Sequence, residues 1–260
     1  MHIDFPQPVL SPCIGICHLD DSGLCVGCFR SAAEIAGWLG MSRTERAAAT
    51  RGVPGMSEHI DIVRLRRAVR PLADPPQPPG WNATEFPELW SDNTPLRQAA
   101  VLLPVICRGD ALSMLFTRRN ETMRHHAGQI SFPGGAMEAA DRDPIAAALR
   151  ETDEETGINA SFVEAFGYLD CFDTISGFSV TPVVGIVRDG FKLNPHPDEV
   201  AEIFEVPLEI ILTPGCLRRS EILWHGRGRE IFEFSYDGKR IWGATAAILQ
   251  NLLRRLEAYR

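Results

Sequence analysis

The sequence contains no long apolar segment and no excess of basic residues. No hydrophobic run among its 260 residues approaches the roughly 18–20 that a transmembrane helix needs, so we expect no membrane span. The formal net charge of -8 disfavours general binding to nucleic acid or to an acidic membrane. The first ten residues include neither lysine nor arginine, so we expect no signal peptide and a cytoplasmic protein with reduced thiols.

The composition is that of an ordinary globular protein. Hydrophobic residues make up 45% of the chain and charged residues 23%, which is enough apolar material for a sizeable core. A chain of this length suggests one large domain, or one domain with a small partner. The sequence divides into a cysteine-rich module at 1–55, a helix with a proline-rich linker or arm at 56–95, and a larger domain at 96–260.

Helical and strand-like periodicities are mixed along the chain and indicate an α/β or α+β layered fold. Asp143 is a suitable N-cap, Pro144 suits the first helical position, and Gly157 suits the residue that follows the helix. The hydrophobic pattern predicts helices at 31–39, 60–69, 144–156 and 244–259. It predicts strands at 99–107, 111–118, 130–132, 163–168, 178–187 and 231–236.

Four cysteines at chelating spacings mark the N-terminal module. They are Cys13, Cys17, Cys25 and Cys28. In a reducing compartment this set favours a tetrahedral Zn²⁺ bound by four thiolates, with an iron–sulfur cluster as the alternative and disulfides less favoured. Residues 11–38 resemble a small bacterial domain of unknown function. A module of about 45 residues buries too little surface to fold without a metal, so we expect a structural role.

Three glutamates share one face of the predicted helix at 144–156. Glu151, Glu154 and Glu155 stand at positions i, i+3 and i+4, a pattern that a solvated acidic surface would also show. They lie in the last turns, where the helix dipole disfavours each anion by roughly 0.3–1 kcal/mol. A hard divalent cation such as Mg²⁺ or Mn²⁺ would reverse this penalty. The pattern therefore predicts a metal site.

A glycine-rich turn precedes this helix. Gly134 and Gly135 follow the predicted strand at 130–132, and glycine lets a backbone approach a metal or a phosphate closely. By itself Pro-Gly-Gly indicates only a turn. Before a capped helix with three acids on one face, it indicates part of a binding site.

Residues 135–158 resemble the Nudix box. The family pattern is a glycine, five residues, a glutamate, seven residues and Arg-Glu-U-x-Glu-Glu-x-Gly-U, in which U is apolar. The second half is matched by Arg150, Glu151, Glu154, Glu155, Gly157 and Ile158, with Thr152 as an imperfect first U. The first half is one residue longer than the pattern, and Asp141 or Arg142 takes the place of the first glutamate.

The resemblance implies a Nudix α/β/α sandwich with a mixed sheet and a metal-dependent attack of water on a diphosphate. It implies that the three glutamates hold Mg²⁺ or Mn²⁺ and that Arg150 orients their carboxylates. The residues do not single out a general base. Glu199 is our candidate, Glu202 is nearly as good, and either could be an ordinary surface acid.

Segments outside the box resemble one branch of that family, the coenzyme A diphosphatases. They are residues 115–135, 199–208 and 241–249, and the resemblance covers about residues 96–256. It implies that the substrate is coenzyme A or a derivative, with 3′-phospho-ADP and 4′-phosphopantetheine as products. The last of these segments fits packing between a strand and a helix better than ligand contact.

A basic patch lies just before the glycine-rich turn, in an otherwise acidic protein. It contains Arg118, Arg119, Arg124, His125 and His126. Guanidinium groups bind phosphate oxygens in pairs, and coenzyme A carries a 3′-phosphate besides its diphosphate. The alternative without a function in binding is a solvated hairpin tip, with His126 in a structural role. We expect substrate binding by Arg118, Arg119, Arg124, His126, Gly134 and Gly135.

Two other functions stay open. A Nudix enzyme for NADH or ADP-ribose is one, because NADH diphosphatases also place a four-cysteine zinc module before the Nudix domain. They carry a Ser-Gln-Pro-Trp-Pro-Phe-Pro-like segment after the box that this chain lacks. A regulator that only senses a nucleotide is the other, although the three intact glutamates oppose it. The sequence leaves the oligomeric state open, with a homodimer among the options.

The cysteine spacings generate the first prediction. Purified protein should carry about one Zn²⁺ per chain, because four thiolates prefer this ion. Elemental analysis measures the metal directly, and a sample with Cys25→Ser serves as the comparison. Iron in place of zinc, or no metal after gentle purification, would contradict the structural zinc.

Overall fold

The computed structural model describes most of the chain and divides it into two compact units. The described residues are 31–41, 60–84, 95–108, 111–123, 126–224 and 227–258. The units are Met1–Arg67 and Ala68–Arg260. None of the helices in these ranges is long and apolar enough to cross a membrane.

The first unit contributes short helical elements to the described part. Helix α1 (Ala32–Gly37) continues into the 3-10 helix η1 (Trp38–Gly40), which confirms the helix predicted at 31–39. Helix α3 (Ile60–Ala68) confirms the one predicted at 60–69 and ends at the boundary between the units. The four cysteines of the module lie outside the described residues.

The second unit is built on a mixed sheet. Within the described residues the sheet has eight strands, in the order β3-β2-β1-β7-β5, with β4 on β1, β6 on β7 and β8 on β2. The strands β1 and β7 are parallel, and the other pairs are antiparallel. Their bounds are β1 (Arg97–Arg108), β2 (Ala111–Arg119), β3 (Ile130–Ser131), β4 (Gly134–Ala136), β5 (Val163–Tyr168), β6 (Phe172–Asp173), β7 (Phe178–Arg188) and β8 (Val200–Pro207).

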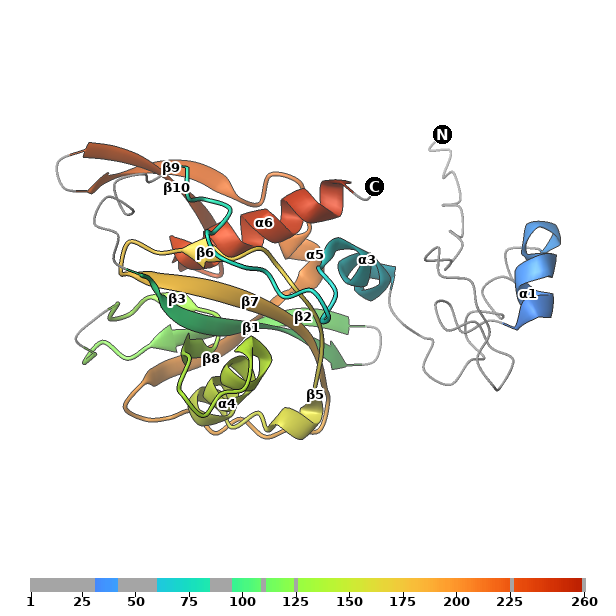
Figure 1. Ribbon diagram of the computed structural model, residues 1–260, viewed down its shortest axis with the longest axis horizontal. Coiled ribbons are helices and arrows are strands. Elements are labelled where there is room, and N and C mark those ends of the chain that lie inside the picture. Colours follow the sequence, from blue (N-terminus) through green and yellow to red (C-terminus); the bar gives the residue numbers. More distant parts are fainter. Residues whose placement is uncertain are drawn as a thin grey trace. The chain divides into compact units, whose positions relative to one another are not determined.

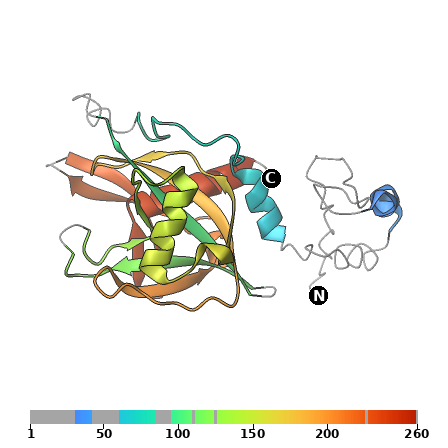
Figure 2. The ribbon, with the colours of Figure 1, turned by 60° about the horizontal axis from the view of Figure 1, so that its bottom comes forward.

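Helices cover both faces of this sheet (Figure 1). Helix α4 (Pro144–Thr156) lies on one face, and α6 (Ala244–Ala258) lies on the other. The view in Figure 2 shows the same arrangement, with α4 in front of the strands. The expected α/β/α sandwich with a mixed sheet is therefore confirmed.

A smaller antiparallel sheet precedes α6. It consists of β9 (Arg218–Trp224), β10 (Arg227–Tyr236) and β11 (Lys239–Trp242), in the order β11-β10-β9. The short helices η3 (Ala160–Phe162) and α5 (Leu208–Ile211) complete the described elements of the unit. The Thr245 hydroxyl donates to the carbonyl of Ile130 (3.0 Å), which fixes the start of α6 to β3.

The core follows from the alternation of side chains along the strands. On the α4 side, Ala147 and Ala148 pack with Leu102 and Val183 in a cluster without solvent access. On the opposite face of β2 three rings are stacked. The Phe116 ring lies 4.9 Å from that of Phe132 and 5.7 Å from that of Phe204, between centroids. The sheet thus buries apolar side chains on both faces, as a sheet between helices must.

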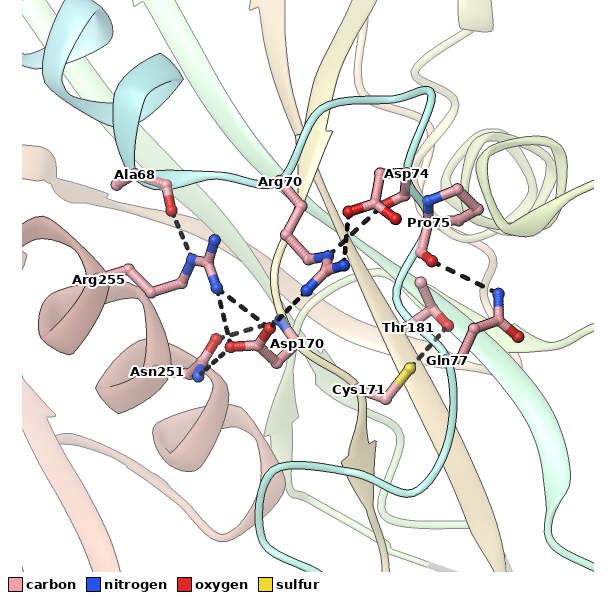
Figure 3. A network of polar contacts seen from close by, with 10 residues as sticks. All are labelled: Ala68, Arg70, Asp74, Pro75, Gln77, Asp170, Cys171, Thr181, Asn251 and Arg255. Carbon is pink, nitrogen blue, oxygen red and sulfur yellow. Dashed lines mark hydrogen bonds and ion pairs between the residues drawn. The ribbon is translucent and has the colours of Figure 1, made fainter.

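The first residues of the second unit pack against β5 and α6 of the same unit. The Arg255 guanidinium of α6 donates to the carbonyl of Ala68, and it also donates to both carboxylate oxygens of Asp170 (3.1 and 2.9 Å), as Figure 3 shows. The backbone of Arg70 exchanges two hydrogen bonds with Tyr168 at the end of β5 (2.8 and 3.0 Å). These contacts tie the start of the unit to both β5 and α6.

The proline-rich stretch continues along β6. Asn82, which is 1% exposed, donates to the carbonyl of Asp173 (2.8 Å) and accepts from its N–H (2.9 Å). The N–H of Gly80 donates to the Asp173 carboxylate, and a side chain on Gly80 would meet that carboxylate. The stretch is therefore an arm packed on the sheet. The compact unit starts at Ala68, upstream of residue 96, where the sequence indicates the start of the larger domain.

The arm generates a stability prediction. Asn82→Ala leaves the buried N–H and carbonyl of Asp173 without their partners, and each such loss costs about 1–3 kcal/mol. For a unit of this size, 1 kcal/mol lowers Tm by roughly 2–4 °C. Thermal unfolding of the whole chain should show a drop of several degrees. Gln77→Ala, on the exposed part of the arm, is the matched control. An equal Tm for both variants would show that the arm adds little stability.

Candidate active site at the end of α4

The sequence sets the two ends of α4 locally. The Asp143 side chain accepts a hydrogen bond from the N–H of Ala146 (2.7 Å), and Pro144 follows as the first helical residue. The helix ends at Gly157, whose φ of 76° lies in the left-handed region that favours glycine. The bounds predicted for this helix are confirmed.

A loop from farther along the chain caps the last carbonyls of α4. The N–H of Asn194 donates to the carbonyl of Thr156 (2.8 Å), and that of His196 donates to the carbonyl of Glu155 (3.1 Å). A side chain on Gly157 would collide with Asn194. These bonds satisfy acceptors that a helix end leaves free. They also fix the segment that carries Glu199, three residues beyond His196.

The three glutamates of the helix differ in exposure. The side chain of Glu155 is 5% exposed and that of Glu151 is 18% exposed, whereas that of Glu154 is 60% exposed. The Glu154 carboxylate lies 3.6 Å from the Arg150 guanidinium. The structure thus brings Glu151 and Glu155 into the site and leaves Glu154 at its edge.

The carboxylates interact through their charges. Burial raises the pKa of Glu155 to about 8; the Arg119 guanidinium and the N–H of Gly134 oppose this shift, and Glu151 and Glu199 add to it. Burial also raises the pKa of Glu151, which Arg150 opposes and Glu154 and Glu199 reinforce. Glu199 therefore lies close enough to act on both buried acids.

These residues fit a divalent cation. Glu155 has weak partners, because the Gly134 nitrogen is 3.4 Å and an Arg119 nitrogen 3.8 Å from its oxygens. Neighbouring buried carboxylates with few donors are stabilised by a hard cation. In the part of the chain that the structure describes, no three acidic, histidine or cysteine side chains converge on one point as they stand. Glu151 and Glu155 would hold the ion, with Glu154 or Glu199 turned toward it.

Arg150 settles the ambiguity in the first half of the box. Its guanidinium donates to both oxygens of Asp141 (3.1 and 2.9 Å) and to Glu151 (2.9 Å). The hydrogen bond from Arg150 lowers the pKa of Asp141, and the one to Asp141 raises the pKa of Arg150. Arg142 is 83% exposed and pairs with Asp143. Asp141 therefore takes the place of the missing glutamate.

The two glycines of the turn are required by close packing. A side chain on Gly135 would come within 2.6 Å of the Glu151 oxygens. Gly134 has a φ of 152°, and a side chain there would collide with the carbonyl of Ala100 in β1. Both residues let β4 lie between β1 and α4. Their contact with a substrate stays a prediction.

The predicted basic patch is divided between the two faces of β2. Arg119 lies beside Glu155, whereas Arg118 lies 3.2 Å from Glu202 on β8. His126, with a φ of 57°, is exposed in the turn between β2 and β3, where its Nδ1 lies 2.9 Å from Gln129. Arg124 and His125 lie outside the described residues. Of the three patch residues that the structure describes, Arg119 is the one that it places beside the acidic helix.

The two candidate bases are also separated. Glu199 acts on the buried acids of α4, whereas Glu202 pairs with Arg118 and with Lys239 of β11 (3.2 Å). This placement favours Glu199. Sequence reasoning missed Lys239 and the capping role of residues 194–196, because nothing near them in the sequence marks a contact with distant strands or with α4.

Known proteins resemble both parts of the chain. Residues 96–223 match the family described as "NUDIX domain", and residues 11–56 match "Protein of unknown function (DUF1289)". A protein of Photorhabdus laumondii, "Uncharacterized Nudix hydrolase NudL", is 40% identical over 171 residues, which are 66% of this chain and 90% of that protein. Its namesake in Pectobacterium atrosepticum is 42% identical over 156 residues, 60% of this chain and 81% of that protein.

The similarity to solved structures is lower than the similarity to these relatives. The MutT protein from Methanosarcina mazei Go1 is 20% identical and aligns with a TM-score of 0.40 over 64% of this chain and 96% of its own. At this level of similarity, the family assignment comes from the sequence relatives.

The burial of Glu155 generates a prediction about stability. Its pKa is about 8 in the folded protein against an ordinary 4.5, so the folded state holds a proton that the unfolded chain releases. Without metal, the protein should be most stable below pH 4.5 as far as this group is concerned, and lose stability as the pH rises through 8. Glu155→Gln removes this dependence, so its Tm advantage over the parent should grow between those pH values.

The same variant should lose turnover by more than roughly 100-fold, because even partners of metal ligands can cost 10–100-fold. Thermal melts in a chelator and a diphosphatase assay with Mg²⁺ measure the two effects. Glu209→Gln, an exposed acid of α5, should change neither. A destabilised Glu155→Gln with normal turnover would show that the carboxylate has a structural role only.

Proposed function

The chain belongs to the Nudix hydrolase family, and from this premise we propose that it hydrolyses the diphosphate of coenzyme A or a derivative, with Mg²⁺ or Mn²⁺. That the protein is a diphosphatase follows from the family. The choice of substrate rests on one observation above all. Arg119, within the segment that resembles coenzyme A diphosphatases, lies 3.8 Å from the buried Glu155 of α4.

The described residues have distinct tasks in this reaction. Glu151 and Glu155 would hold a divalent cation, which would supply positive charge for the diphosphate and acidify a bound water. Arg150, held by Asp141, keeps the Glu151 carboxylate in place. Arg119 offers its guanidinium to a diphosphate oxygen. Glu199, supported by the loop that caps α4, accepts the proton of the attacking water.

The products follow from the balance of phosphorus atoms. Coenzyme A has a diphosphate and a separate 3′-phosphate, and cleavage within the diphosphate leaves one phosphate on each half. The nucleotide product is therefore adenosine 3′,5′-bisphosphate, which is 3′-phospho-AMP, beside 4′-phosphopantetheine. This corrects the 3′-phospho-ADP expected from the resemblance, because that compound would keep both phosphates of the cleaved bond.

Hydrolysis of NADH or ADP-ribose is the alternative for the same site. Neither compound carries a 3′-phosphate, so the basic residues around β2 distinguish the two proposals. A regulator that senses a nucleotide without cleaving it has no support in the acids of α4. A surface sensor does not need two carboxylates whose pKa values are raised by burial.

A substrate panel tests this proposal. Coenzyme A, dephospho-coenzyme A, NADH and ADP-ribose are supplied separately with Mg²⁺ or Mn²⁺, and products are identified by mass. Loss of one charge-assisted hydrogen bond to phosphate costs about 1.5–3 kcal/mol, so coenzyme A should exceed its dephospho form by roughly 10- to 150-fold in kcat/KM. Faster cleavage of NADH or ADP-ribose would overturn the coenzyme A assignment and leave the diphosphatase.

A further inference from the structure

Arg118 and Arg119 are adjacent in sequence but reach opposite faces of the sheet. Arg118 stands opposite Glu202 in the pairing of β2 with β8, and its Nε lies 3.2 Å from Glu202 Oε2. Arg119 lies 3.8 Å from Glu155 of α4. The register shift at this point falls on β8, which advances two residues for one of β2. The strand β2 therefore keeps its alternation.

Lys239 joins Arg118 on the face away from α4. It follows the turn at Asp237 and Gly238, which both have a positive φ (49° and 72°). Its ammonium lies 3.2 Å from Glu202 Oε1 and 5.1 Å from the centre of the Phe204 ring. Glu202 is thus shared by two cations from separate sheets. Asp237 lies 3.8 Å from the ammonium but is 80% exposed, so solvent screens its charge.

These two cations have more donors than their shared carboxylate can use. An arginine has five N–H groups and an ammonium has three. The Nε of Arg118 is buried and makes no hydrogen bond within the described residues, although it lies near Glu202. The side chains of Arg118 and Lys239 are 40% and 22% exposed, so a ligand can reach them. The exposed donors of these two side chains suit a phosphate, which accepts through three oxygens.

We propose that the two arginines bind different phosphates of one substrate. Arg119 binds the diphosphate at α4, and Arg118 together with Lys239 binds a phosphomonoester on the other face. Arg119 is the last residue of β2, so a ligand that passes the end of this strand meets both side chains. This inference rests on the proposed function, in which the phosphomonoester is the 3′-phosphate of coenzyme A.

The test compares kcat/KM for coenzyme A and dephospho-coenzyme A in single variants. Arg118→Met and Lys239→Met should each lower the value for coenzyme A by about tenfold and leave that for dephospho-coenzyme A within about twofold. Arg119→Met should lower both values by a similar factor. Arg240→Met, a neighbouring cation of the same hairpin that pairs with Glu233, should change neither. Lys239→Arg should retain much of the preference.

A binding measurement separates this inference from the proposed function. Calorimetry compares adenosine 3′,5′-bisphosphate with AMP, which differ only in the 3′-phosphate. The parent should bind the bisphosphate more tightly, and Lys239→Met should remove most of that difference. Equal affinities in the parent, or an unchanged difference in both Arg118→Met and Lys239→Met, would overturn the inference. Failure of coenzyme A in the substrate panel alone would overturn only the proposed substrate.

Discussion

The carboxylate of Glu155 is buried in the last turn of a helix. The free-energy cost of a negative charge at this position is the constraint on which the rest of the site depends. The helix dipole disfavours an anion there, and burial disfavours it more. The partners that oppose the cost are an N–H at 3.4 Å and a guanidinium at 3.8 Å, both too distant to offset it fully. A sequence selected for stability alone would have no reason to keep this acid. Its presence at this position therefore favours a ligand whose positive charge offsets the cost of burial.

The end of the same helix also positions the carboxylate of Glu199. Two N–H groups of residues 194–196 satisfy carbonyls of Glu155 and Thr156, and the chain then reaches Glu199 before β8 begins. The hydrogen bonds that cap the helix therefore also fix the position of Glu199. A change that loosens the cap would therefore shift Glu199 relative to Glu155.

The parts of this structure that depend on neighbours in sequence could be predicted, and those that depend on distant pairing could not. The caps Asp143 and Gly157 act within their own helix, so the bounds of α4 were readable. The strand β8 was missed, because its acids hide the periodicity and its partner β2 lies far away in sequence. The sequence predicts the basic patch as one surface for the same reason. The alternation of side chains along β2 places Arg118 beside Glu202 and Arg119 beside Glu155, on opposite faces.

The two buried glutamates of the helix are held in different ways, and this affects how a cation can bind. Glu151 is fixed by a 2.9 Å bond from Arg150, itself fixed by Asp141, and by contact with Gly135. Among the residues that the structure describes, Glu155 has no partner as close, and its pKa of about 8 means that it holds a proton at neutral pH. A cation at this site would therefore meet one oriented carboxylate and would displace a proton from the other. Metal binding would then be coupled to release of a proton, and the Arg119 guanidinium, which lies beside Glu155, opposes the raised pKa of that acid.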